Sequence, residues 1–168
     1  MKIGITGTTA GIGRTLSERF EDVSTFNRTD GSLNDCALVF SKFSTCDVFI
    51  NNAYDTDAQP KLLDYFYKQW RDTNKKIVSI GSVVCSYAPS GEGHELYIDH
   101  KKKLRQVHLD IVKQKNACRS FLVNPGPTDT KMISHKHCAK LTTDQVYKII
   151  KYVLDAETYI PEIFFYAE

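Results

Sequence analysis

The sequence has little of what marks a membrane-bound, secreted or nucleic-acid-binding protein. Its formal net charge of +2 over 168 residues is too small to favour a nucleic acid or an anionic membrane surface as a partner. No apolar run approaches the roughly 20 residues of a membrane span. The first apolar run follows Met1 directly, so we expect no signal peptide. Together these absences predict a cytoplasmic protein.

The five cysteines include no Cys-x-x-Cys pair, and their number is odd. We therefore expect reduced thiols in a cytosol-like compartment. His135, His137 and Cys138 come nearest to a set of metal ligands, but their spacing suits no common zinc pattern. The sequence thus predicts no metal site.

Internal repeats, low-complexity tracts and linkers are absent as well, and the length favours one domain over residues 1–168. Strand-like apolar runs alternate with helix-like runs along the chain. This alternation predicts an α/β fold, a Rossmann-like doubly wound parallel sheet of about six strands with helices on both faces. The expected strands are 2–5, 23–26, 47–51, 76–82, 119–124 and 163–166, and the expected helices are 14–20, 33–43, 60–73, 95–114 and one that opens on the capping box 142–145.

A glycine-rich turn, Thr6 to Gly13, lies between the first expected strand and the first expected helix. Glycines let the backbone approach a pyrophosphate, and the helix N-terminus supplies free N–H groups and a partial positive charge. The spacing alone is weak evidence and also fits a purely structural turn, but the position is the one that the motif needs. The turn therefore predicts a dinucleotide site that includes Gly7, Thr8, Thr9, Gly11, Ile12 and Gly13.

Polar residues also follow the other strands. Because ligands of parallel sheets bind beyond the carboxyl ends of the strands, we expect these residues to gather at one edge. The long helix 95–114 adds Tyr97 and Lys101, which are four residues apart and so share a face. The residues at the strand ends are Asn27 and Arg28, Asn51 to Tyr54, Ser82, and Asn124 to Thr130.

In this order the motifs resemble those of the short-chain dehydrogenase/reductase family. The resemblance spans essentially the whole chain, although the chain is much shorter than a typical member. The matching segments are Thr6–Gly13, Asn51–Ala53, Ser82, Tyr97 with Lys101, and Pro125-Gly126 with Thr130. A second Tyr-x-x-x-Lys, formed by Tyr147 and Lys151, lies in the final amphipathic helix, where we expect a packing role.

The resemblance implies an NAD(P)-dependent oxidoreductase that transfers hydride between a nicotinamide and a small carbonyl or alcohol substrate. Tyr97 would be the general acid or base, Ser82 would hydrogen-bond the substrate oxygen, and Lys101 would hold the ribose hydroxyls. An ammonium about 4 Å from the phenol would contribute about 4 kcal/mol at an effective dielectric near 20, and so would lower the Tyr97 pKa. The family's cofactor contacts would fall on Asn51, Asn52, Ala53, Tyr97, Lys101, Pro125, Gly126, Thr128 and Thr130.

Arg28 favours NADP as the cofactor, with NAD as the alternative. An NAD site usually offers a carboxylate at the end of the second strand, where this chain has Asn27. A guanidinium suits a 2′-phosphate through bidentate, charge-assisted hydrogen bonds, and Arg14 would help. Asp30 is either the missing carboxylate or a partner for the adenine edge.

The chain departs from the family pattern in four places. Tyr54 replaces the glycine that usually ends Asn-Asn-Ala-Gly. The stretch from Asn27 to Asp47 has room for one helix but not for the usual extra strand and helix. The segment 53–77 offers no counterpart of the family's catalytic asparagine, since Asn74 lies too close to the next strand. Between Thr130 and Thr142 little chain remains for a substrate lid.

These departures keep other functions open. A degenerate, non-catalytic dinucleotide-binding module is the main alternative to the enzyme. An epimerase-like or dehydratase-like use of the Tyr/Lys pair is less favoured, because the glycine spacing differs and no substrate domain follows. Nucleic-acid binding through the run 100–103 is least favoured, and we expect a solvated helix face there.

We expect the segments 83–96 and 131–141 to form the substrate pocket, and neither contains a motif specific to one substrate class. Family members commonly dimerise through the helices that correspond to 60–73 and 95–114, so we expect a homodimer or homotetramer. The aromatics Tyr65, Phe66 and Trp70 would serve either that interface or the core.

Overall fold

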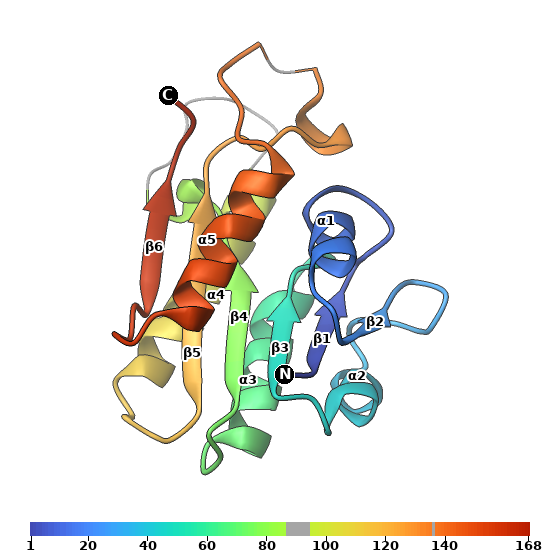
Figure 1. The fold of residues 1–168 in the computed structure, drawn as a ribbon, viewed down its shortest axis with the longest axis vertical. Coiled ribbons are helices and arrows are strands. Elements are labelled where there is room, and N and C mark those ends of the chain that lie inside the picture. The colour runs from blue at the N-terminus through green and yellow to red at the C-terminus, as the bar shows by residue number, and fades with distance from the viewer. Residues whose placement is uncertain (87–94, 136) are drawn as a thin grey trace.

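The computed structural model describes residues 1–86, 95–135 and 137–168, apart from the side chain of Met132 (Figure 1). Six parallel strands form one sheet in the order β2-β1-β3-β4-β5-β6. The predicted doubly wound α/β fold is confirmed. The strands are β1 (Ile3–Thr6), β2 (Val23–Phe26), β3 (Val48–Asn51), β4 (Lys76–Ile80), β5 (Arg119–Pro125) and β6 (Glu162–Phe165).

The strand order reverses at β1, which pairs with β2 on one side and with β3 on the other. Ile3 aligns with Val23 of β2 and with Val48 of β3. The chain therefore runs outward to β2, crosses back over β1 and continues outward through β3 to β6. Such a reversal opens a crevice at the carboxyl ends of the two inner strands, where ligands of this architecture bind.

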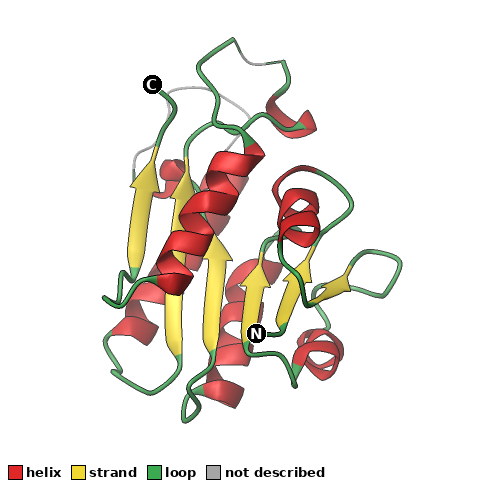
Figure 2. Cartoon of the chain, in the orientation of Figure 1, coloured by secondary structure: helices red, strands yellow, loops and turns green. Residues whose placement is uncertain are grey.

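Helices cover both faces of the sheet (Figure 2). The helices α1 (Gly11–Arg19) and α5 (Thr143–Asp155) share one face with Val48 and Ile50 of the sheet. Phe49, between these two residues, points to the opposite face and packs among the other three helices. This alternation buries β3 on both sides, as a parallel strand requires. The three helices on the face of Phe49 are α2 (Cys36–Phe43), α3 (Ala58–Trp70) and α4 (Glu95–Val112). The chain also forms two short 3₁₀ helices within the described residues, η1 (Val83–Cys85) and η2 (Lys131–Ile133).

Three helix starts differ from the sequence expectation. α1 begins at Gly11 rather than at residue 14, so the last part of the glycine turn is already helical. α2 begins at Cys36 rather than at residue 33, because the Asp35 carboxylate accepts a hydrogen bond from Leu38 N at 3.0 Å and caps the helix there. α3 begins at Ala58, so Pro60 lies in its first turn, where the missing N–H costs no intrahelical bond. The predicted capping box of α5 is confirmed, with the Thr142 hydroxyl accepting from Gln145 N at 3.1 Å.

The aromatic residues of α3 belong to the core. Phe66 and Trp70 are 0 % and 2 % exposed, and the Phe66 ring stacks on Phe49 at 3.8 Å between centroids. Tyr65 packs partly buried against the same cluster. These rings therefore offer no free interface, and the oligomeric state stays a prediction.

The connection between β2 and β3 is short. Only α2 lies between β2 and β3, as the short stretch from Asn27 to Asp47 predicted. The second Tyr-x-x-x-Lys is structural, since the Tyr147 ring packs edge-on against Phe20 at 5.2 Å and Lys151 pairs with Asp155. Across the ranges that the structure describes, no helix is both long and apolar enough to cross a membrane.

Candidate functional site

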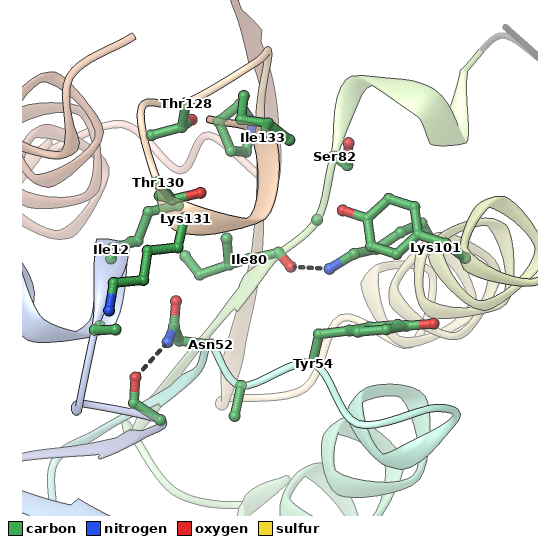
Figure 3. A pocket seen from close by; sticks show the side chains of 18 of the residues that line it. Ile12, Asn52, Tyr54, Ile80, Ser82, Lys101, Thr128, Thr130, Lys131 and Ile133 are labelled. Carbon is green, nitrogen blue, oxygen red and sulfur yellow. Dashed lines mark hydrogen bonds between the residues drawn. The ribbon is translucent and has the colours of Figure 1, made fainter. Parts of the chain in front are cut away.

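One cavity of about 910 Å³ lies at the carboxyl ends of the strands, over the strand-order reversal (Figure 3). Most of the residues expected from the sequence line it. Ser82, Lys101 and Tyr54 lie on one side, and Ile12 and Lys131 lie on the other. The expected residues that line it are Gly7, Thr9, Gly11, Ile12, Gly13, Asn27, Arg28, Asn52, Ala53, Ser82, Tyr97, Lys101, Pro125, Gly126, Thr128 and Thr130.

The backbone of the glycine turn lines the cavity, and side chains at its glycines would collide with neighbouring protein atoms. Gly7 and Gly11 have φ angles of +72° and +56°, which L residues rarely adopt. A Cβ on Gly13 would lie 2.0 Å from the Gly7 carbonyl oxygen. Asn52 holds the turn from the side, since its Nδ2 donates to Thr6 O at 3.0 Å and to Gly7 O at 3.1 Å. The backbone is therefore shaped to approach a ligand closely at the start of α1.

Two expected cofactor residues do not line the cavity. Thr8 N donates to Asn27 Oδ1 at 2.8 Å, and the two side chains also bond each other, so this pair braces the turn. Asn51 is fully buried, and its Nδ2 donates to Gln59 O at 2.8 Å. Both positions thus support the site from behind.

The described lining of the cavity carries cations and no carboxylate. Among the described residues that line the cavity, none is Asp or Glu, whereas Arg28, Lys131 and Lys101 are basic. Asp30 is turned away, because its carboxylate accepts from Asn27 N at 2.7 Å. Arg14 is paired with Glu18 at 2.8 Å outside the cavity. The described lining of the cavity as a whole therefore suits an anion.

A buried network holds Ser82 in place. The Asn124 side chain is fully buried, and its Oδ1 accepts from Ser82 N at 3.1 Å. A Cβ on Gly81 would lie 2.0 Å from that oxygen, so only glycine lets Asn124 approach. The Ser82 hydroxyl, which accepts from Val84 N at 3.5 Å, caps η1 and faces the cavity.

Tyr97 sits beside Ser82 and under a wall formed by Tyr54. The Tyr54 and Tyr97 rings meet edge-on at 5.0 Å, and the Tyr54 hydroxyl lies 3.0 Å from His100 Nδ1. Burial raises the pKa of Tyr97, and a side-chain hydrogen bond with Ser82 opposes that shift. The structure therefore contradicts the expectation of a lowered Tyr97 pKa, because burial of the phenol itself is the largest effect and raises that pKa.

Lys101 is 4 % exposed, and two of its N–H groups donate hydrogen bonds to other atoms of the protein. Its Nζ donates to Gln59 Oε1 at 2.7 Å and to Ile80 O at 2.8 Å. It also lies 5.7 Å and 5.5 Å from the centroids of the Tyr54 and Tyr97 rings. Burial lowers the pKa of Lys101 to about 7, so the ammonium is only partly charged at neutral pH.

Sequence reasoning missed several residues of the site. Gln59 touches Lys101 from the start of α3, and nothing local marks it, since the contact spans 42 positions. Other lining residues fall in the two segments that we expected to form the pocket, although they were not singled out there. Lys131, Ile133 and His135 come from segment 131–141, and Val83 and Val84 come from segment 83–96. Residues 87–94 of that expected wall fall outside the described ranges.

The cysteines and the histidines near Cys138 lie outside the cavity, except for His135, which lines it. All five cysteines are free. Within residues 1–86, 95–135 and 137–168, no group of three or more Cys, His, Asp or Glu side chains is placed to hold a metal ion. The cavity described above is therefore the place where chemistry is expected.

Comparisons with known proteins give a fold and no close sequence relative. Neither a protein-family model nor a curated protein sequence matches the chain. A short-chain dehydrogenase from Burkholderia cenocepacia in complex with NADP aligns over 98 % of this chain and 89 % of its own, with a TM-score of 0.78 and 15 % identity. An alcohol dehydrogenase from the archaeon Thermococcus sibiricus, complexed with 5-hydroxy-NADP, aligns over 98 % and 96 %, with a TM-score of 0.75 and 16 % identity.

A third structure is a 3-ketoacyl-(acyl-carrier-protein) reductase from Brucella melitensis complexed with NADH. It aligns over 98 % of this chain and 96 % of its own, with a TM-score of 0.76 and 13 % identity. Sequence identities this low establish a shared fold, and any activity has to be argued from the residues of the site. The chain has the fold of the short-chain dehydrogenases/reductases.

Proposed function

We propose that this chain is a single-domain, NADP(H)-dependent oxidoreductase of the short-chain dehydrogenase/reductase type that reduces a small carbonyl compound. The observation that carries the proposal is the meeting of Ser82, Tyr97 and Lys101 in the cavity that the glycine turn opens. These residues come from two separate elements, with Ser82 at the start of η1 and both Tyr97 and Lys101 on α4. Their side-chain types match an oxyanion partner, a proton donor and a cation, in that order.

The cavity fits a dinucleotide phosphate on three grounds. The backbone of Gly7, Gly11 and Gly13 lines the cavity at the start of α1, where the helix N-terminus would face a pyrophosphate. The exposed guanidinium of Arg28 lies at the end of β2, where a 2′-phosphate would be bound. The described lining residues include no carboxylate to accept from a free 2′-hydroxyl or to repel a phosphate. The last point favours NADP over NAD.

The residues divide the work of carbonyl reduction. A bound reduced nicotinamide would supply the hydride. Tyr97 would be the general acid that protonates the substrate oxygen, since its phenol lines the cavity beside Ser82. Ser82, fixed through its backbone by Asn124, donates to the same oxygen as negative charge develops there. Lys101 offers its remaining N–H to the ribose.

The lining of the cavity near Ser82 is mostly apolar. Val83, Val84 and Ile133 line it, and Tyr54 occupies space that a glycine leaves open in the family. Tyr54 packs against both Tyr97 and His100, so it forms a wall rather than a free lid. This lining suits a small carbonyl substrate with an apolar body.

A non-catalytic dinucleotide-binding module is the second candidate. It is favoured by the internal hydrogen bonds of Lys101, which leave one N–H for a cofactor, and by the added bulk of Tyr54. The two candidates differ in what Tyr97 does. In the enzyme, removal of the Tyr97 hydroxyl lowers turnover. In a non-catalytic module, the same change has no turnover to affect.

The Tyr97→Phe variant separates them. With NADPH and a panel of small aldehydes and ketones, we expect turnover to fall by about 10²-fold or more, the usual contribution of a general acid. NADPH affinity should stay within a few-fold of wild type. Tyr147→Phe removes the hydroxyl of the other Tyr-x-x-x-Lys and should change neither. Retained turnover in Tyr97→Phe refutes the assignment, and NADPH binding by a wild type that reduces no carbonyl favours the module.

A further inference from the structure

Gln59 is a buried glutamine that connects the start of α3 to the candidate site. Its side chain is 2 % exposed and does not line the cavity. Oε1 accepts from Lys101 Nζ at 2.7 Å. Nε2 donates to Asn51 O at 2.9 Å and to Ile80 O at 3.1 Å. The backbone is also held, because Asn51 Nδ2 donates to Gln59 O at 2.8 Å.

These contacts allow only one orientation of the amide. Backbone carbonyls accept and never donate, so the NH₂ group must face Asn51 O and Ile80 O. The amide oxygen is then left to face the ammonium, which can only donate. Ile80 O accepts from both Nε2 and Lys101 Nζ, and this closes a small ring of hydrogen bonds. Gln59 therefore presents a fixed, neutral acceptor to Lys101.

We propose that Gln59 is a positioning residue that holds the Lys101 Nζ atom at the edge of the cavity, so that the third N–H of the ammonium is left for the ribose. The inference rests on the proposed function for its catalytic consequence. The structural part does not, since the hydrogen bonds exist without any cofactor. Within the described ranges, the Lys101 Nζ atom forms hydrogen bonds only with Gln59 Oε1 and Ile80 O.

The neutrality of the acceptor matters as much as its place. The titratable groups that face Lys101 are Tyr54, Tyr97 and Cys85, and none is a carboxylate. Burial therefore lowers the Lys101 pKa to about 7 without an ion pair to restore it. A glutamine keeps the lysine in place while leaving it free to change charge near neutral pH. A glutamate there would lock it in the charged form.

The test is an NMR titration of Lys101 in protein labelled with ¹³C at lysine Cε, with the resonance assigned by its loss in Lys101→Met. We expect the Lys101 midpoint to rise by more than one pH unit in Gln59→Glu. In Gln59→Met, which removes the acceptor, the midpoint should fall. Gln145→Glu makes the same chemical change in the exposed cap of α5 and should leave Lys101 unchanged.

Kinetics provide the second measurement. The high-pH limb of kcat/KM should follow the Lys101 midpoint in Gln59→Glu, and kcat in Gln59→Met should fall by about tenfold or more. A purely structural role would lower stability without moving either the midpoint or the pH limb, and that result overturns the proposal. If Gln59→Glu does not fold, an unchanged midpoint in Gln59→Met overturns it equally. Failure of wild type to bind NADPH refutes the proposed function and leaves the titration result standing.

Discussion

The side-chain oxygen of Asn124 accepts a hydrogen bond from the backbone nitrogen of Ser82 at 3.1 Å. The other half of the same amide donates to Glu162 Oε1 at 3.0 Å. Glu162 is itself held by Arg105, whose Nε and Nη2 reach its two oxygens at 2.7 and 3.0 Å. Because a carboxylate only accepts, Glu162 decides which way the amide of Asn124 faces. The last strand thus orients a residue of the site.

Asn124→Ala should release Ser82 and lower turnover with NADPH by about tenfold. It leaves the buried Ser82 N–H without a partner, which costs about 1–3 kcal/mol of unfolding free energy. Asn116→Ala is the matched control, since it removes an amide that bonds only the Tyr67 hydroxyl, at 2.9 Å. Steady-state kinetics and urea denaturation of both variants measure the effects. Equal turnover in the two variants would show that Asn124 does not hold the site.

Arg28→Ala should weaken NADPH binding by about 10- to 100-fold, as the loss of a charge-assisted, bidentate phosphate contact does. NADH carries no 2′-phosphate, so its affinity should change little. Arg14→Ala tests whether any nearby arginine matters, because Arg14 is paired with Glu18 outside the cavity. Nicotinamide fluorescence gives all the dissociation constants. A parallel loss for NADPH and NADH would contradict the role of Arg28 in cofactor choice.

Gly13→Ala should destabilise the fold by about 3 kcal/mol or more, at the upper end of overpacking effects. The new Cβ would lie 2.0 Å from the carbonyl oxygen of Gly7 and 2.5 Å from Asn52 Nδ2. The backbone oxygen cannot give way without opening the glycine turn. At Gly126 the nearest atom to a new Cβ is 3.2 Å away, so Gly126→Ala should cost less. Thermal unfolding of the two variants decides whether the close approach at Gly13 is needed.

His108 should make stability fall in mild acid. It is fully buried on Ser120, and burial lowers its pKa from 6.5 to about 4. The unfolded chain therefore takes up a proton below pH 6.5 that the folded chain refuses, so stability is lost as the pH falls from about 6.5 to 4. The full effect is about 3 kcal/mol, at 1.36 kcal/mol per unit. His108→Gln, which cannot titrate, should lose that share of the slope in urea melts. A slope equal to wild type would contradict it.

Much of the fold follows from local patterns in the sequence. The apolar runs of β1, β3 and β5 and the capping box of Thr142 and Gln145 each carry their own signal, because period and capping depend on neighbours in the chain. The start of α2 could not be placed from its apolar spacing, which begins at Leu33. The Asp35 cap overrides that spacing.

Residues of the candidate site that belong to a sequence motif could be predicted, whereas residues that reach it only through tertiary contacts could not. Ser82, Tyr97 and Lys101 stand at spacings that the sequence displays. Gln59 meets Lys101 only after α3 and α4 have packed side by side, and no local pattern encodes that meeting. The direction of the Tyr97 pKa shift was missed for the same reason, since it depends on burial that arises from tertiary packing.

Titration of the purified protein with NADPH and NADH, followed by nicotinamide fluorescence, tests the central claim most directly. The account predicts saturable binding of NADPH, with NADH bound at least about tenfold more weakly because it lacks the phosphate that Arg28 would hold. Binding of neither cofactor would contradict the account, since the glycine turn and the carboxylate-free cavity would then have no dinucleotide to hold.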